Sequence, residues 1–306
     1  MKEQTVYALG FFDGVHLGHQ ALLKAGRELA DKHGCKAGVV TFSSHPDAFI
    51  FGKPPALLST SEDRKALLLA CHIETVIERN FDEQLMNTHW SAFLAQLEEI
   101  GAAGFVCGDD FRFGKGGEGT AEKLAKWCGA KNIPCIILPQ QELDGIRVSS
   151  THIRALLEQG KMAEAVRFLG HPHRMTGCVV HGKHLGHQLG IPTANISLPE
   201  GSVRLKNGVY ACAARVDGKG YPAVCNIGTQ PTFGDNALAV EPWILDFEGD
   251  LYGKKLTLDF YDYLRPEQKF SSVEDLKTQI QTDAENTRQL LGCFCRGEHC
   301  SPAGGH

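Results

Sequence analysis

The 306-residue sequence predicts two domains of different classes: an α/β domain built on a parallel sheet, then an antiparallel β-barrel that ends in a helix. The length suffices for about two domains. Strand-like and helix-like segments alternate through the first half, which is typical of a parallel sheet covered by helices. In the second half, strand-like segments follow one another with turn residues between them, which favours a barrel.

The first domain is expected to span residues 1–172. Strands are expected at residues 6–9, 37–42, 74–77, 104–107 and 134–138. Helices are expected at residues 21–33, 61–71, 88–99, 121–131 and 150–159, with one more that ends at residue 169. Ser61 is a candidate N-cap.

The second domain is expected to span residues 173–292, after the boundary sequence Gly170-His171-Pro172-His173. Strands are expected at residues 174–181, 208–216, 221–227, 239–247 and 255–263, and a final helix at residues 273–291. Residues 293–306 are rich in glycine and polar side chains, and we expect them to form a disordered tail.

Composition narrows the possible partners. The net charge is −5 and aromatic residues make up 8% of the chain, so neither a basic field nor basic-aromatic patterning predicts nucleic-acid binding. No apolar run approaches the length of about 18 residues that a membrane span needs. The first four residues do not form a signal-peptide pattern, so we expect a cytoplasmic protein whose 11 cysteines are not a disulfide framework.

The most informative motif is Gly10-Phe11-Phe12-Asp13-Gly14-Val15-His16-Leu17-Gly18-His19. It lies at a predicted strand-to-helix turn, where unpaired N–H groups and the helix dipole favour phosphate. Histidines there can hold a triphosphate without acting as nucleophiles, and Gly18 lets the backbone approach closely. The motif predicts nucleotidyl transfer. The alternatives are a surface turn with incidental histidines and a zinc pair, for which a third ligand is missing.

Two further loops are expected at the same edge of the sheet, because they also follow apolar runs. The first contains His45, within Thr41-Phe42-Ser43-Ser44-His45-Pro46. The second is Gly-rich, spans residues 108–117 and contains Asp110. Its spacing is not that of a P-loop. Phe111 and Phe113 could stack on a flat ring there, or they could simply anchor an ordinary loop.

Residues 148–154 open a helix with three consecutive hydroxyl side chains. Ser149 or Ser150 is a candidate N-cap, and caps of this kind are common. Alternatively, Arg154 lies one turn into the helix and could clamp a phosphate together with these hydroxyls.

In the second half, residues 185–195 combine Gly and Pro with Thr193 and Asn195, whose oxygens could hold Mg²⁺. Residues 177–183 imitate a P-loop without its Ser or Thr, and we reject that interpretation. A metal site at His181, His184 and His187 fits the spacing poorly. Glu241 lies within an apolar strand pattern and is either an edge-strand residue, as the neighbouring Pro242 suggests, or a functional base.

Together these motifs resemble the bacterial bifunctional riboflavin kinase/FAD synthetase family, from about Tyr7 to Asp283. In the first half the resemblance is carried by GFFDGVHLGHQ, TFSSHP, GDDFRFGKG and SSTHIR. In the second half it is carried by GKHLGHQLGIPTANI, GVYA, NIGTQPTF, VEPWILDF, LYG and LRPEQKF.

The resemblance implies a nucleotidyltransferase-like domain that adenylates FMN to FAD and pyrophosphate, and a kinase barrel that phosphorylates riboflavin to FMN. The substrates would be the small molecules ATP, riboflavin and FMN, with Mg²⁺ as cofactor. Two other interpretations stay open: a chain that retains one of the two activities, and a non-catalytic flavin-binding regulator.

The resemblance also implies roles for single residues. His16, His19 and Arg154 would promote adenylyl transfer. ATP contacts in the first domain would come from Gly10, Phe11, Asp13, Gly14, His16, Gly18, His19, Ser150, Thr151 and Arg154. Flavin contacts there would come from His45, Asp110, Phe111 and Arg112.

In the barrel, Glu241 would take the proton of the ribityl 5′-hydroxyl and, with Arg265, would lie at the flavin. Thr193 and Asn195 would hold Mg²⁺. The ATP contacts would come from Gly182, Lys183, Gly186, Pro192, Thr193 and Asn195.

The chain departs from the family pattern at several positions. Gly117, His187 and Gln230 stand where arginine is frequent, and Pro242-Trp243 replaces a more typical strand pair. Each lost guanidinium removes a charge-assisted phosphate contact of roughly 1.5–3 kcal/mol. We expect these departures to affect nucleotide affinity more than the reaction.

Overall fold

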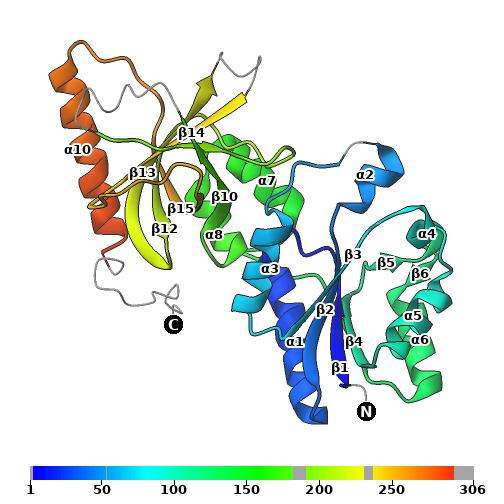
Figure 1. The fold of residues 1–306 in the computed structure, drawn as a ribbon. Coiled ribbons are helices and arrows are strands. Elements are labelled where there is room, and N and C mark those ends of the chain that lie inside the picture. Colours follow the sequence, from blue (N-terminus) through cyan, green and yellow to red (C-terminus); the bar gives the residue numbers. More distant parts are fainter. Residues whose placement is uncertain (1–2, 53, 182–190, 231–236, 293–306) are drawn as a thin grey trace. The chain divides into compact units, whose positions relative to one another are not determined.

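The computed structural model of the chain describes residues 3–52, 54–181, 191–230 and 237–292. Contacts divide the chain into two units (Figure 1). The first contains the residues up to 55 together with residues 61–150, and the second contains residues 56–60 together with those from 151 onward.

The first unit is built on a five-stranded sheet with the order β3-β2-β1-β4-β7. All of its strand pairs are parallel, as the alternating pattern predicts. In chain order the strands are β1 (Thr5–Leu9), β2 (Lys36–Phe42), β3 (Thr75–Arg79), β4 (Ala102–Gly108) and β7 (Cys135–Leu138).

Helices cover both faces of this sheet (Figure 1). Tyr7 and Leu9 of β1 pack into a core with α5 (Trp90–Glu99) and α6 (Ala121–Lys131). Val6 and Ala8 point to the opposite face, where α1 (Leu17–His33) and α3 (Ser61–Ala70) supply the core. The alternation of side chains along a strand explains why a continuous apolar run fits a sheet that is buried on both faces.

Several short elements were not predicted. They are η1 (Asp13–Val15), α2 (Pro46–Phe51), α4 (Glu83–Met86), β5 (Arg112–Phe113), η2 (Lys115–Gly117), β6 (Gly119–Thr120), β8 (Glu142–Leu143) and β9 (Ile146–Arg147). The N-cap prediction for Ser61 was wrong, because α3 already begins at this residue. The Ser61 hydroxyl instead donates to the Glu78 carboxylate, with O–O distances of 2.6 and 2.7 Å.

In the second unit six antiparallel strands close into a barrel with the order β10-β11-β14-β13-β12-β15, which confirms the predicted class. The strands are β10 (His173–Val180), β11 (Asn195–Ser197), β12 (Gly208–Val216), β13 (Lys219–Gln230), β14 (Ala237–Ile244) and β15 (Lys255–Arg265). The long helix α10 (Val273–Leu290) packs against β12 and β13 (Figure 1).

Two segments of the predicted first domain join this unit. The helix α8 (Met162–Leu169), which follows α7 (Ser150–Gln159), packs on β10 and β15. Leu57 pairs beside Ser202: its N–H donates to Gly201 O at 2.7 Å, and its carbonyl accepts from Val203 N at 2.8 Å. The domain boundary at residue 172 stays a prediction.

Closure of the barrel settles one alternative. The strand β14 has hydrogen-bonded neighbours on both sides, so the edge-strand interpretation of Glu241 was wrong.

Within the described ranges, no helix combines the length and the apolar character that crossing a membrane requires.

Candidate active sites

The loops that follow β1, β4 and β7 line a cavity of about 250 Å³. The strand order reverses between β1 and β4, and open parallel sheets bind ligands at such a switch point. Of the residues predicted to bind here, the cavity is lined by Gly10, Phe11, His16, Gly18, His19, Asp110, Phe111 and Ser150.

His16 and His19 form a stacked pair at the start of α1. The ring centroids are 3.7 Å apart and the ring planes differ by 14°. His16 is the N-cap of α1, and its Nδ1 accepts a hydrogen bond from the His19 backbone N–H at 3.3 Å. A Cβ at Gly18 would lie 3.2 Å from the Cε1 atom of His16, so a glycine leaves room for this packing.

His19 carries no charge near neutral pH. Burial of its ring, with the nearby His16 and Arg64, holds the pKa of His19 well below the usual 6.5. Its Nδ1 is buried and has no hydrogen-bond partner in the part of the chain that the structure describes. A neutral imidazole can present one N–H to an anionic oxygen, which is the role that a phosphate contact needs.

The loop before this pair is strained and held by side chains from elsewhere. Phe12 and Val15 adopt φ angles of 61° and 42°, which non-glycine residues rarely occupy. Thr41 Oγ1 donates to Phe11 O at 2.9 Å, and Ser150 Oγ donates to Asp13 O at 3.1 Å. Ser150 therefore supports the loop with its hydroxyl.

Asp13 and Gly14, two predicted ATP contacts, do not belong to the cavity lining. Asp13 is buried, with 3% of its surface exposed, and Gly14 supplies a left-handed turn with φ of 73°. Both residues shape the loop that carries His16.

Asp110 stands at the cavity in a polar cluster. Its Oδ2 accepts from Arg147 Nη2 and from Gln140 Nε2, each at 2.9 Å. Arg147 belongs to the short strand β9 and was missed in the sequence, because a two-residue strand has no periodicity that would mark its side chains. It brings a guanidinium to the same cavity as the two histidines.

Phe111 and Phe113 divide their roles. Phe111 lines the cavity, and its ring lies 5.5 Å from that of Phe113. Phe113 is buried in the core against Phe93, at a ring-centroid distance of 5.7 Å. Phe113 is thus the anchor of the loop.

Four predicted residues lie elsewhere. His45 caps α2 through Nδ1, which accepts from Asp47 N at 3.2 Å, and its ring meets the edge of Phe11 at 4.7 Å. Arg112 is exposed on β5. Thr151 and Arg154 follow Ser150 on α7, where Arg154 Nη1 lies 3.5 Å from Thr151 Oγ1, and contacts group them with the second unit.

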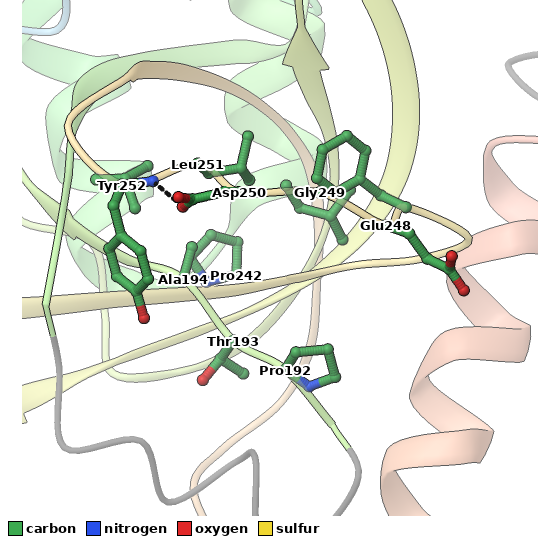
Figure 2. A pocket seen from close by; sticks show the side chains of 12 residues that line it. Pro192, Thr193, Ala194, Pro242, Glu248, Gly249, Asp250, Leu251 and Tyr252 are labelled. Atoms are coloured by element: carbon green, nitrogen blue, oxygen red, sulfur yellow. Dashed lines mark hydrogen bonds between the residues drawn. The ribbon is translucent and has the colours of Figure 1, made fainter.

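The barrel contains a second pocket of about 490 Å³ (Figure 2). Figure 2 shows Pro192 and Thr193 on one side of it and residues 248–252 on the other. Asp250 Oδ1 accepts from Tyr252 N at 2.9 Å, and the Tyr252 ring stacks on His181 at 4.0 Å. The pocket therefore combines an apolar lining with hydroxyl and carboxylate oxygens.

Glu241 and Pro242 belong to opposite faces of β14. Pro242 and Ile244 line the pocket, so the alternation along the strand places Glu241 with Trp243 on the other face. Trp243 packs against a cluster that includes Ala284 of α10. Glu241 is half-buried, on the face of the strand that α10 covers.

Arg265, the predicted flavin neighbour, is bound to α10. Its Nε and Nη2 donate to Asp283 Oδ2 at 3.0 and 2.8 Å. Asp283 also accepts from Gln279 Nε2 at 3.0 Å. The strand β15 is thereby tied to the helix through a buried ion pair.

Oxygen donors suited to a divalent cation are present at the pocket. Thr193 lines it, and Asn195 begins β11 two residues later. The predicted ATP contacts Gly182, Lys183 and Gly186 lie outside the described residues, as do His184 and His187 and the tail at 293–306. Within the described ranges, no three His, Cys, Asp or Glu side chains cluster to hold a metal ion.

Comparison with known proteins assigns a family to each half of the chain. Residues 1–152 match the FAD synthetase family, and residues 169–291 match the riboflavin kinase family. A relative from Listeria monocytogenes, named bifunctional riboflavin kinase/FMN adenylyltransferase, is 36% identical over 94% of this chain and 92% of its own length. Relatives of the same name are 38% identical in Pseudomonas fluorescens (93% of this chain, 92% of theirs) and 36% identical in Escherichia coli (95% and 94%).

Among solved structures, a Streptococcus pneumoniae protein named as a macrolide-efflux protein superposes with a TM-score of 0.83. It is 31% identical and covers 94% of this chain and 95% of its own. The efflux name is that of the Streptococcus pneumoniae protein. Both family matches and the curated relatives instead name riboflavin kinase, FAD synthetase or FMN adenylyltransferase. This chain belongs to the bifunctional riboflavin kinase/FMN adenylyltransferase family.

Proposed function

We propose that the chain phosphorylates riboflavin to FMN in its barrel and adenylates FMN to FAD in its first unit, using ATP in both steps. The stacked His16–His19 pair at the switch point of a parallel sheet carries the proposal, since it adds a nucleotidyl-transfer site to a chain that also contains the kinase barrel. A chain with one activity or a non-catalytic regulator is less favoured, because His16, His19, Thr193 and Glu241 are all present.

In the adenylyl step, a phosphate oxygen of FMN attacks the α-phosphorus of ATP, and the bond from that phosphorus to pyrophosphate breaks. The nucleophile is already an anion, so no general base is needed and charge stabilisation is the main requirement. The start of α1, the imidazole N–H groups and the Arg147 guanidinium supply it at the cavity. We place Ser150 at the phosphates, and Asp110 and Phe111 on the flavin side. Phosphate contacts of Thr151 and Arg154, which contacts group with the second unit, stay a prediction.

In the kinase step, the ribityl 5′-hydroxyl attacks the γ-phosphorus and ADP leaves. We assign Glu241 as the base that accepts the hydroxyl proton, a role worth about 10²- to 10⁴-fold in rate. We place the nucleotide in the pocket that Pro242 lines and the flavin toward α10. The ribityl 5′-hydroxyl then lies beside Glu241 and in contact with the γ-phosphate, as phosphoryl transfer requires.

Enzymes of this family use ATP and typically a divalent metal, and we propose Mg²⁺ here. The Thr193 and Asn195 side-chain oxygens fit it, because Mg²⁺ prefers one or two protein oxygens together with phosphates and water. When bound, the cation neutralises charge on the phosphates. We also propose a cytoplasmic location, with ATP, riboflavin and FMN as the partners.

Two product assays test the proposal: riboflavin with Mg-ATP, and FMN with Mg-ATP, each followed by chromatography of the flavins. Glu241→Gln is expected to abolish FMN formation and to leave adenylation intact. His19→Ala is expected to lower adenylation by on the order of 10²-fold and to leave phosphorylation intact.

Matched controls are Glu274→Gln at the start of α10 and His33→Ala at the far end of α1, both exposed. Retained kinase activity in Glu241→Gln would refute the assignment of the base. Flavin binding without any product from the unaltered chain would favour the regulator.

A further inference from the structure

Arg64 is the largest fully buried side chain among the described residues, with 1% of its surface exposed. Its Nη2 donates to Phe42 O at 2.6 Å. Its guanidinium carbon lies 4.4 Å from the centre of the Phe11 ring, a cation–π contact. A buried guanidinium costs several kcal/mol unless it is well compensated, so its place under the adenylyl-transfer cavity needs a reason.

The residues around Arg64 are those that shape the cavity. Phe11 lines the cavity, and the edge of its ring also meets His45. The helix α3, which carries Arg64, contacts η1, where the strained backbone at Phe12 and Val15 lies. Arg64 therefore supports the loop that positions both Phe11 and the histidine pair.

The charge of Arg64 is only partly compensated. Asp13 and Glu78 attract it, while burial lowers its pKa. Its Nη1 is buried and makes no hydrogen bond within the described residues. A fixed positive charge in this position acts on the His19 imidazole.

We propose that Arg64 is a positioning residue of the adenylyl-transfer site, acting through Phe11 and His19 without touching the substrate. The inference rests on the proposed function. It assigns Arg64 two separable roles: a planar contact that orients Phe11, and a charge that disfavours protonation of His19.

The second role has a chemical consequence. Groups that face His19 are His16 at the N-cap of its helix, Phe12 of the preceding loop, and Arg64 from α3. Among them Arg64 holds a permanent positive charge. Burial is the main cause that lowers the pKa of His19 and keeps it a neutral N–H donor, and the charge of Arg64 adds to this effect. The positive field that attracts a triphosphate then comes from a group that does not titrate.

The test uses three variants of the full chain. Arg64→Met removes charge and planar contact but keeps a similar length. Arg64→Lys keeps the charge and loses the planar fork. Arg79→Met is the matched control, since Arg79 makes a similar contact with the Phe93 ring, 5.9 Å away, and does not line the cavity.

Two readouts separate the roles. The pKa of His19 is followed by ¹H–¹⁵N NMR, with the signal assigned through His19→Gln, and adenylation kinetics are measured from pH 5 to 9. In Arg64→Met we expect the pKa of His19 and the acidic limb of kcat/KM to rise together, by on the order of 0.5–1 pH unit. In Arg64→Lys we expect no such rise, but a kcat/KM for adenylation lowered several-fold.

Riboflavin phosphorylation reports on the barrel and is expected to stay unchanged in all three variants. Arg64→Met with an unmoved His19 titration and an unmoved pH profile would overturn the charge role. Arg64→Lys with full adenylation would overturn the planar role. If Arg64→Met does not fold, comparison of Arg64→Lys with the Arg79→Met control still tests the planar role. Arg64→Gln then replaces Arg64→Met in the test of the charge role.

A failure of the proposed function is distinguishable. In that case the unaltered chain makes no FAD, while the change in His19 titration between Arg64→Met and the unaltered chain still measures the link between these two residues.

Discussion

Replacing Asp283 by alanine is expected to loosen α10 from the barrel and to impair riboflavin phosphorylation selectively. Asp283 is 2% exposed, and its carboxylate accepts four hydrogen bonds in which Arg265 and Gln279 are the donors. Arg265 itself is mostly buried, with 16% of its side chain exposed. The truncation therefore leaves a guanidinium buried without its counter-charge.

The magnitude follows from this geometry. Breaking a buried pair by removing one partner costs about 3–5 kcal/mol, because the remaining charge is uncompensated. Replacing both Asp283 and Arg265 by apolar residues of similar size costs less, because no charge is then left buried without a partner. We expect Asp283→Leu combined with Arg265→Met to recover more than about half of the loss seen with Asp283→Ala.

Urea unfolding monitored by fluorescence measures this effect. The chain has 3 tryptophans, and of these Trp243 reports on the barrel, where it packs in the cluster with Ala284. A background in which Trp90 and Trp127 are phenylalanine isolates its signal, and FMN adenylation serves as the reference for the first unit.

A loss under about 1 kcal/mol for Asp283→Ala would refute the reasoning, because it would show that solvent reaches Arg265 and compensates its charge. A double variant less stable than either single one would also contradict it, since the cost would then come from lost packing.

Two further outcomes follow from the charges in each unit. Burial, with a contribution from His171, lowers the pKa of His173 to about 3, so between pH 3 and 6.5 the unfolded chain binds the extra proton. Barrel stability should therefore fall as the pH drops below 6.5, by at most about 1.4 kcal/mol per pH unit, and His173→Phe should flatten this slope in urea titrations. Asp110→Asn should change stability by less than about 1 kcal/mol, because the pair with Arg147 is exposed. It should raise KM for FMN, because Asp110 is placed on the flavin side, and a lowered KM would instead indicate that Asp110 mainly holds Arg147 away from the phosphate.

The sequence predicts the layout of both units because their larger elements obey simple patterns. Apolar runs alternate with helical periodicity in the first half, and short strands with turn residues fill the second. The turn at residues 10–19 is recognisable since glycines and histidines follow an apolar run directly. The sequence pattern does not show which group each charged side chain pairs with.

Arg64 illustrates this limit. Within Ser61–Ala70 it is one of several charged residues in the sequence, yet its side chain is buried against Phe11, which lines the cavity. Arg147 was missed for a different reason, because β9 is two residues long. The face of Glu241 was also undecidable, since it depends on how β14 closes the barrel.

The two halves solve the same electrostatic problem in different ways. Both proposed reactions bring a nucleophile toward the polyanion ATP. In the adenylyl step the attacking group is charged from the start, so the site needs fixed positive and N–H groups, and a carboxylate beside the attacking phosphate would repel it. In the kinase step the attacking group is a neutral alcohol, so a carboxylate that accepts its proton gains a function. The alternation of β14 turns Pro242 toward the pocket proposed for the nucleotide and Glu241 toward the opposite face. On this reasoning, exchanging the order of these two neighbours would place a negative charge in the pocket and remove the base from the flavin face in a single change.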